Sequence, residues 1–293
     1  MPELGLPGTS EDPIFIVFEY TAGGSLFDFL QSRKGSKLGL LAQTAMLRDV
    51  AAGMAFLERS HWVHADLAAR NCLVGAKSEV KICDFGHAIK TNDTNDPVRN
   101  AITIPIRWSA PEFFDTIHCS PATDVWSFAI VVFEVFLRGA VPYAEMDNAL
   151  TGYDNKTLIA MLMAGYRMDR PRKIPVYYYS MMLDCMQHDA ANRPTFARLL
   201  ETLNVLVSST KLKEAGAALV DATGANHGYQ FTGPPYDRLD REEVRETAAK
   251  TIRAWHATAE ANTKQRSREM ARSMKENKKN KGKRGTSKGL AVR

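Results

Sequence analysis

The stretch that decides the fold is His64-Ala65-Asp66-Leu67-Ala68-Ala69-Arg70-Asn71, which lies between a long helical pattern and two short apolar runs. Thirteen residues after Asn71 comes Asp84-Phe85-Gly86, and further along the chain stands Ala110-Pro111-Glu112. Each of these sequences is weak evidence by itself. Together, in this order and at this spacing, they form a specific signal for one site built from separate turns of one domain.

Helical patterns dominate the regions around this stretch. Apolar residues recur at helical spacing from Leu47 to Leu57 and predict an amphipathic helix over residues 40–59. The run from Val125 to Leu137 is apolar on all sides, which predicts a buried core helix beginning after Pro121. Further helices are expected over residues 26–32, 154–164, 176–187 and 195–207.

Three short apolar runs predict strands. The run Ile14–Tyr20 is rich in β-branched and aromatic residues and reads as a buried strand, which Thr21-Ala22-Gly23-Gly24 ends. The runs over residues 72–74 and 80–83 are separated by a polar turn and predict a small hairpin. The polar stretch over residues 91–100 is expected to be a loop.

The composition is that of a soluble globular protein. The chain has 293 residues, of which 45% are hydrophobic and 24% charged, so a sizeable core is expected. Its four cysteines form no C-x-x-C pair and no zinc-type spacing, which argues for a reducing, intracellular compartment. The most apolar stretch is shorter than the roughly 20 residues that cross a bilayer.

Composition also divides the chain into segments. We expect a disordered lead over residues 1–12, one domain over 13–207, a linker over 208–240, and a helical then disordered basic tail over 241–293. Residues 264–293 carry a charge of +10, which leaves −5 for the rest of a chain whose total is +5. The tail is read as a solvated segment, a nuclear-localisation or nucleic-acid patch, or a contact for an anionic membrane. No aromatic residue interrupts its charges, so no specific nucleic-acid partner is expected.

The three short sequences resemble the protein kinase signature of catalytic loop, metal-binding D-F-G and A-P-E. Asp124-Val125-Trp126-Ser127-Phe128 and Asn192-Arg193-Pro194 add to this resemblance, which covers residues 13–207. It implies an α+β, protein-kinase-like fold, here mainly the α-helical large lobe with a few short strands. It also implies that Glu112 and Arg193 form a buried ion pair.

The resemblance implies ATP-dependent phosphoryl transfer to a protein, with ATP and Mg²⁺ as cofactors. Asp66 would accept the proton of the attacking hydroxyl, and Arg70 would hold the phosphate. Asn71 and Asp84 would bind Mg²⁺ through oxygen atoms, which this ion prefers.

The resemblance also assigns residues to the nucleotide. Phe18 occupies the gatekeeper position, and Glu19 and Thr21 would offer backbone groups to adenine. Asp28 lies where kinases meet the ribose, and Leu73 would form the floor under the adenine. Phe18 and Leu73 also read simply as core residues, and both interpretations can hold together.

Two features resemble tyrosine kinases in particular. In Ala68-Ala69-Arg70 the Arg would take over the phosphate contact that serine/threonine kinases give to a Lys two residues after the Asp, a position that is Ala68 here. Pro105-Ile106-Arg107-Trp108 resembles the wall against which a substrate phenol ring packs. A protein substrate with tyrosine is therefore expected, in the cytoplasm or, because of the basic tail, in the nucleus; membrane association is left open.

The sequence departs from the kinase pattern in several places. Neither G-x-G-x-x-G nor V-A-x-K occurs before Ile14, so an N-terminal lobe is expected to be missing. The face of the large lobe that this would expose is expected to need a protein partner. Ala65 stands where kinases have Arg, and His87 and Ala129 replace an apolar residue and a Gly. Three interpretations stay open: a piece of an active tyrosine kinase, a catalytically impaired pseudokinase-like interaction module, and a basic-tailed adaptor.

Overall fold

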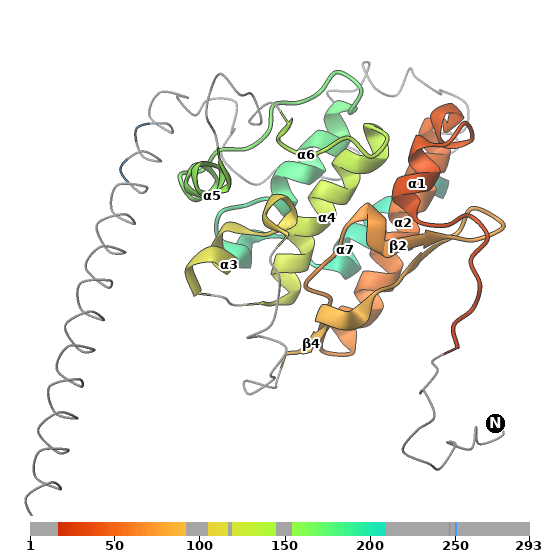
Figure 1. Ribbon diagram of the computed structural model, residues 1–293, viewed down its shortest axis with the longest axis horizontal. Helices are drawn as coiled ribbons and strands as arrows, with labels where there is room; N and C mark the ends of the chain where they lie inside the picture. The colour runs from red at the N-terminus through yellow and green to blue at the C-terminus, as the bar shows by residue number, and fades with distance from the viewer. Residues whose placement is uncertain are drawn as a thin grey trace, which may run out of the picture.

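Seven helices build most of the lobe that the structure describes. This computed structural model describes residues 17–91, 105–116, 119–144 and 154–208, together with positions 246 and 250. In Figure 1 the helices gather around the long α4. The described helices are α1 (Leu26–Gln31), α2 (Leu40–Arg59), α3 (Pro111–Thr116), α4 (Pro121–Phe136), α5 (Asn155–Met163), α6 (Val176–Cys185) and α7 (Phe196–Ser208).

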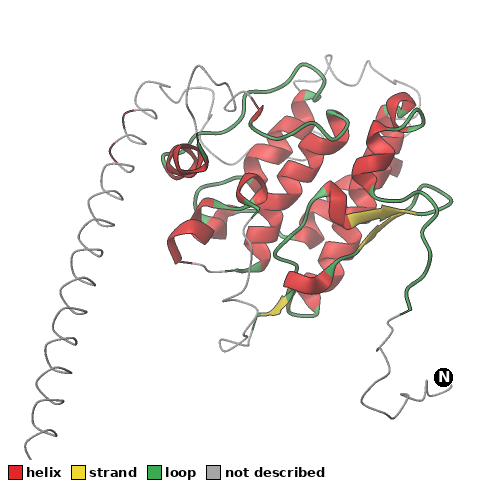
Figure 2. Cartoon of the chain, in the orientation of Figure 1, coloured by secondary structure: helices red, strands yellow, loops and turns green. Residues whose placement is uncertain are grey.

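The described strands are short and form two separate antiparallel pairs at the edge of the helices, as Figure 2 shows. In the first pair Cys72 lies opposite Ile82, and in the second Trp62 lies opposite Lys90. The hairpin expected from the sequence is therefore confirmed. The strands are β1 (Trp62–Val63), β2 (Cys72–Val74), β3 (Val80–Ile82) and β4 (Ile89–Lys90).

Helix α4 is the centre of the core. Every residue from Thr123 to Phe136 is buried, as an evenly apolar helix requires. The helix begins in a capping box, in which the Thr123 hydroxyl donates to the Ser120 carbonyl at 2.7 Å and accepts from the Ser120 N–H at 3.3 Å. The predicted buried helix is confirmed, and two of its buried residues, Asp124 and Glu134, are carboxylates.

Helix α2 buries one stripe and packs mainly on α7, with β3 beside it. Its bounds, Leu40–Arg59, confirm the amphipathic helix that the apolar spacing predicts. By length and composition alone α2 could cross a membrane, the one helix of the described residues that passes this test. Its contacts with α7 are those of a core helix of the lobe. The helices predicted over 154–164, 176–187 and 195–207 are α5, α6 and α7.

The segment before α1 runs along β2 and depends on two glycines. The Gly23 N–H donates to the Val74 carbonyl, and the Val74 N–H donates to the Gly24 carbonyl, both at 2.9 Å. A Cβ on Gly23 would lie 2.4 Å from the Val74 oxygen, and Gly24 has φ +68°. Only glycine satisfies both demands without strain, and Ser25 then caps α1 by accepting from the Asp28 N–H.

The prediction of a buried strand over Ile14–Tyr20 is wrong for the residues that the structure describes. Residues 17–20 have no regular secondary structure, and the exposed fractions of Val17, Phe18 and Tyr20 are 90%, 78% and 89%. No strand among the described residues pairs with them. An apolar run becomes a buried strand only when a neighbouring strand pairs with its backbone and another layer covers it, and the described residues provide neither for this segment.

Several expectations fall on residues outside the described part. They are the disordered lead, the linker, and most of the loop after Thr91 and of the basic tail. Positions 246 and 250 are helical, and the extent of the helix expected in the first part of the tail stays a prediction.

The core predicts that two phenylalanines contribute very differently to the free energy of unfolding. Phe128 is fully buried and meets Phe196 edge-on, with ring centroids 5.8 Å apart. We expect Phe128→Ala to lower the free energy of unfolding by about 3–5 kcal/mol, because it leaves a cavity beside that ring. Phe56→Ala, at a side chain that is 61% exposed, is the matched control and should cost less than about 1 kcal/mol. Equal losses in urea unfolding would contradict this account of the core.

Candidate active site

A buried carboxylate on α4 holds the first residues of the candidate catalytic loop. Asp124 accepts hydrogen bonds from the backbone N–H of His64 at 2.7 Å and of Ala65 at 3.0 Å. Ala65 has φ +63°, in the left-handed region that a non-glycine residue enters only when its surroundings enforce it. The two bonds to Asp124 supply that enforcement, and they turn the chain so that Asp66 follows at the site.

Three side chains meet at the carboxylate of Asp66, which is 8% exposed. The Asn71 amide donates from Nδ2 to Oδ2 of Asp66 and to its carbonyl oxygen, both at 2.7 Å. Arg70 donates from Nη2 to Oδ1 of Asp66. His87 lies with Nδ1 3.7 Å from Oδ2. The structure thus brings together the three residues assigned to catalysis from the sequence, and it adds His87.

His64 links this loop to the D-F-G segment. Its Nδ1 accepts from the Asp66 N–H at 3.3 Å, and its Nε2 donates to the Cys83 carbonyl at 3.0 Å, which requires the neutral ring with the proton on Nε2. Burial lowers the pKa of His64, in keeping with that neutral state. The His64 ring lies 5.4 Å from the ring of Phe85, and the Cys83 N–H donates to the Asn71 carbonyl at 3.0 Å, so the D-F-G segment runs beside the candidate catalytic loop.

Asp84 and Asn71 offer oxygen atoms to a cation. Asp84 has φ +61°, and its Oδ1 accepts from the Gly86 N–H at 3.4 Å. Asn71 makes both of its bonds to Asp66 through Nδ2, which leaves its Oδ1 for a ligand. No three His, Cys, Asp or Glu side chains gather as a closed metal site within the described residues. The donor set suits an ion that takes its other ligands from phosphates and water, as Mg²⁺ does.

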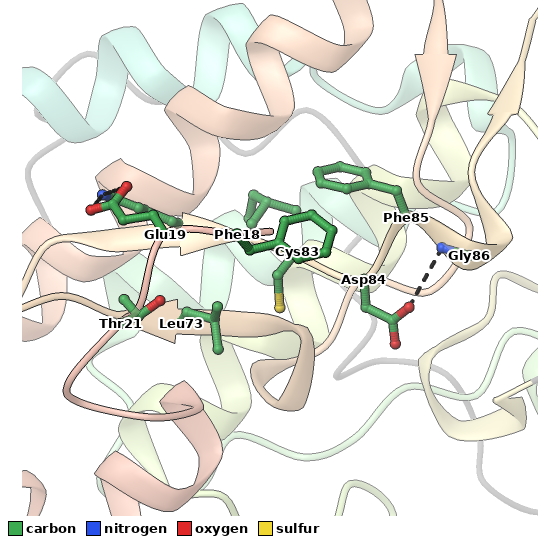
Figure 3. A pocket seen from close by; sticks show the side chains of 10 residues that line it. Phe18, Glu19, Thr21, Leu73, Cys83, Asp84, Phe85 and Gly86 are labelled. Atoms are coloured by element: carbon green, nitrogen blue, oxygen red, sulfur yellow. Dashed lines mark hydrogen bonds and ion pairs between the residues drawn. The ribbon is translucent and has the colours of Figure 1, made fainter. Parts of the chain in front are cut away.

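A cleft of about 620 Å³ opens beside Asp84. In Figure 3, Thr21 and Leu73 lie toward one end, Phe18 and Cys83 lie between, and Asp84 lies at the other end. Its volume is that of a small-molecule site, which usually encloses about 300–1,000 Å³. The lining residues are Phe18, Glu19, Thr21, Leu73, Lys81, Ile82, Cys83, Asp84, Phe85 and Gly86.

Five residues that the sequence assigned to the nucleotide line this cleft, and a sixth does not. The five are Phe18, Glu19, Thr21, Leu73 and Asp84. The carboxylate of Glu19 accepts from Lys81 Nζ at 2.7 and 2.8 Å, which ties the segment before α1 to β3. Asp28 is exposed at the start of α1, where it accepts from the Ser25 hydroxyl at 2.6 Å.

Comparison with known proteins agrees with this geometry. The profile of a family described as protein tyrosine and serine/threonine kinase matches residues 4–203, more than half of the chain. The chain belongs to this kinase family. The predicted protein-kinase-like fold is therefore confirmed, in the form of its helical lobe.

Curated relatives of this kinase chain include three tyrosine-protein kinases. It is 40% identical to tyrosine-protein kinase FRK of Homo sapiens over 194 residues, which are 65% of this chain and 37% of that protein. It is 37% identical to tyrosine-protein kinase Abl of Drosophila melanogaster over 71% of this chain and 12% of that protein. For tyrosine-protein kinase TXK of Mus musculus the identity is 36%, over 68% of this chain and 36% of that protein. The kinase chain thus spans little more than a third, or less, of the length of these relatives.

The ion pair expected in this kinase lobe is present. Arg193 donates from Nη1 and Nη2 to the two carboxylate oxygens of Glu112, at 2.6 and 2.8 Å. Its Nε donates to the Gln187 carbonyl at 2.9 Å, and its guanidinium lies 5.2 Å from the ring centre of Trp126. These contacts fasten α3, which follows the Pro105–Trp108 segment, to the core of the lobe.

Sequence reasoning assigned no role to two residues of this site. His87 was noted only as a departure from the kinase pattern, because its contact with Asp66 joins residues 21 positions apart. Glu134 is the one carboxylate in the apolar run Val125–Leu137, and this isolation was the signal that could have revealed it. Its Oε2 accepts from the Ala69 N–H at 2.9 Å and from the Trp108 indole at 3.2 Å.

Burial of Asp124 predicts a pH dependence of stability. Burial raises the pKa of Asp124 from 3.8 to about 7, against the lowering effect of the His64 and Ala65 N–H groups. Between these values the folded chain holds a proton that the unfolded chain has released, so this group makes the free energy of unfolding fall as pH rises from about 4 to about 7.

Asp124→Asn should flatten this dependence. The variant is expected to be less stable at every pH, because Asn offers one acceptor oxygen to two N–H groups. Its stability should nevertheless fall less steeply between pH 4 and pH 7 than that of the unsubstituted chain. Urea unfolding at a series of pH values measures both slopes, and identical slopes would refute the assignment to Asp124.

Proposed function

We propose that this chain supplies the catalytic and substrate-facing half of an ATP-dependent kinase that transfers the γ-phosphate of ATP to protein tyrosine. The observation that carries the proposal is the fixed carboxylate of Asp66, which accepts from Asn71 at 2.7 Å, while the residue before Asp84 donates from its N–H to the Asn71 carbonyl at 3.0 Å. Phosphoryl transfer asks the protein mainly for position and charge neutralisation, and these residues supply both.

In this proposal the cleft of about 620 Å³ takes the nucleotide. The adenine would lie over Leu73 and next to the backbone of Glu19 and Thr21, and the phosphates would extend toward Asp84. Asp84 and Asn71 would hold Mg²⁺, which neutralises charge on the phosphates when it is bound. The residues present fit this cofactor, because the Asp84 carboxylate lies at one end of the cleft and Leu73, Ile82 and other apolar side chains contribute most of the remaining lining.

Asp66 is placed to accept the proton of a substrate hydroxyl. Its burial and the hydrogen bonds that it accepts from Arg70 and Asn71 restrict the carboxylate to one orientation, which general base catalysis requires. Arg70 lies beside it and would pair with the phosphate as charge moves to the transferred group.

Three features support tyrosine as the acceptor. Position 68 is Ala, so no Lys stands two residues after Asp66, and Arg70 is the cation of the loop instead. Trp108 packs against this Arg, with its ring centre 4.7 Å from the guanidinium carbon. The relatives at 36–40% identity are named tyrosine-protein kinases.

Residues 1–13 contain neither G-x-G-x-x-G nor V-A-x-K, the two sequences by which kinases hold the phosphates from their N-terminal lobe. The Lys of the second sequence and its partner Glu must be in place for phosphoryl transfer in kinases. We therefore assign the binding and proton-accepting groups to residues 14–207, and we expect the full rate only where the Lys and Glu of an N-terminal kinase lobe act with them.

Binding of Mg²⁺–ATP should stabilise the purified chain. At about 100 times the dissociation constant, a ligand adds about 2.7 kcal/mol to the free energy of unfolding, which a thermal shift detects. We expect the shift to require Mg²⁺ and to be lost in Asp84→Asn, because the amide removes the charge that faces the ion. Glu201→Gln, the same chemical change on the exposed side of α7, should leave the shift intact. A chain without a Mg²⁺-dependent shift would contradict the nucleotide site.

Transfer to tyrosine should depend on Asp66. We would measure phosphorylation of a pair of peptides that differ only in Tyr or Ser, with the chain alone and with a tyrosine kinase N-terminal lobe fused ahead of residue 14. The fusion should phosphorylate the Tyr peptide, and Asp66→Asn should lower that rate by about 10²- to 10⁴-fold. The thermal shift with Mg²⁺–ATP should survive in Asp66→Asn, which serves as the control for folding and binding. Labelling of the Ser peptide at an equal rate would refute tyrosine specificity.

A pseudokinase-like interaction module is the second candidate. It is favoured by apolar side chains exposed on the described lobe, with Phe18 at 78%, Phe56 at 61% and Phe85 at 49%, because such a face usually contacts a partner. The retained Asp66, Asn71 and Asp84 favour the enzyme. A fusion that binds Mg²⁺–ATP but phosphorylates the Tyr peptide no faster than its Asp66→Asn variant would favour the interaction module over the enzyme.

A further inference from the structure

A second buried carboxylate of α4 reaches the candidate catalytic loop. Glu134 is 2% exposed and lies in the apolar middle of the core, where a carboxylate is retained only with partners for its oxygens. Oε2 accepts from the backbone N–H of Ala69 at 2.9 Å and from the indole Nε1–H of Trp108 at 3.2 Å. One oxygen atom therefore joins α4, the loop before Asn71 and the short turn Ile106–Trp108.

The indole that Glu134 holds is also the surface on which Arg70 rests. The guanidinium carbon of Arg70 lies 4.7 Å from the centre of the Trp108 ring, within the range of a cation–π contact. Arg70 donates to Asp66 from the same guanidinium group. The contacts thus form a continuous series from Glu134 through Trp108 and Arg70 to Asp66.

Arg70 needs such a support. Its side chain is 39% exposed, and a long Arg side chain has several rotamers of similar energy when nothing restrains it. The flat ring of Trp108 restricts the guanidinium to one plane, and the bond from Nε1 to Glu134 fixes the ring in turn. Burial raises the pKa of Glu134 to about 7, whereas the two N–H donors and the charge of Arg70 lower it, which agrees with Arg70 being close.

We propose that Glu134 is a positioning residue for the catalytic loop: it orients Trp108 and the Ala69 backbone and, through Trp108, holds Arg70 beside Asp66. Glu134 itself contacts no substrate in this arrangement. The role of Arg70 rests on the proposed function, whereas the positioning is a property of the folded chain and can be tested without catalysis.

Two substitutions separate positioning from simple packing. Glu134→Gln keeps a carbonyl oxygen that can accept both hydrogen bonds. Glu134→Met has a similar length but leaves the Ala69 and Trp108 N–H groups without an acceptor. A residue that only fills space in α4 would tolerate Met at least as well as Gln.

The positioning of Trp108 and Arg70 is measured by nitrogen-15 NMR spectroscopy of the full chain. The indole N–H signals of its four tryptophans report on Trp108 and, as a marker of the core, on Trp126. The heteronuclear NOE of the Arg70 Nε–H reports on the mobility of that side chain. Trp108→Phe and Arg70→Lys assign the two signals.

We expect Glu134→Gln to resemble the unsubstituted chain in both signals. Glu134→Met should shift the Trp108 indole signal and lower the Arg70 NOE while the Trp126 signal stays in place. An unchanged Arg70 NOE in a folded Glu134→Met chain, or equal effects of Gln and Met, would overturn the proposal. If Glu134→Met does not fold, Trp108→Phe decides: it keeps a ring under Arg70 but loses the N–H, and an unchanged Arg70 NOE would again overturn the proposal.

In the fused kinase, Glu134→Met should lower kcat by up to about 100-fold with little change in the KM for ATP, and Glu134→Gln should restore kcat. If the fusion is inactive, the proposed function fails while the NMR result still decides the positioning role.

Discussion

The hydrogen bonds from the His64 and Ala65 N–H groups to the buried carboxylate of Asp124 are the constraint on which the site depends. They hold Ala65 at a positive φ, and without that turn Asp66 would not face Asn71. The carboxylate lies in the core, so its loss would leave donors unsatisfied where water does not reach. Stability and site geometry therefore depend on the same atoms.

Helix α4 holds the loop at two points rather than one. Asp124 binds its beginning and Glu134 binds it at Ala69, ten residues further along the helix, which is about 15 Å of helical rise. A buried helix is among the most rigid elements of a fold, because every side chain is packed. Because the two carboxylates are fixed on α4, they fix the backbone of the loop at its beginning and at Ala69. Asp66 lies between these two points.

Local sequence was enough to predict the helices and the hairpin, because their apolar periodicity and capping residues act within each segment. That Asp66, Asn71 and Asp84 would converge was predicted from their resemblance to a known arrangement, and the structure joins the first two directly. The conformation of residues 17–20 could not be predicted from local sequence, since an apolar run forms a strand only beside a partner strand. The contacts of Glu134 and His87 also escaped the sequence, because each joins segments far apart in the chain. Buried polar residues in apolar helices mark such contacts, although they do not reveal the partner.

Both oxygens of the Asp66 carboxylate already have side-chain neighbours in the folded chain. Oδ1 accepts from Arg70, and Oδ2 accepts from Asn71 and lies 3.7 Å from His87. Each oxygen keeps a second lone pair, so an incoming hydroxyl finds an acceptor but needs space that an existing neighbour has to yield. The imidazole is the most distant of the three, so its departure costs the least. Binding of a substrate hydroxyl at this carboxylate would then displace His87, which lies beside Asp66 in the absence of substrate.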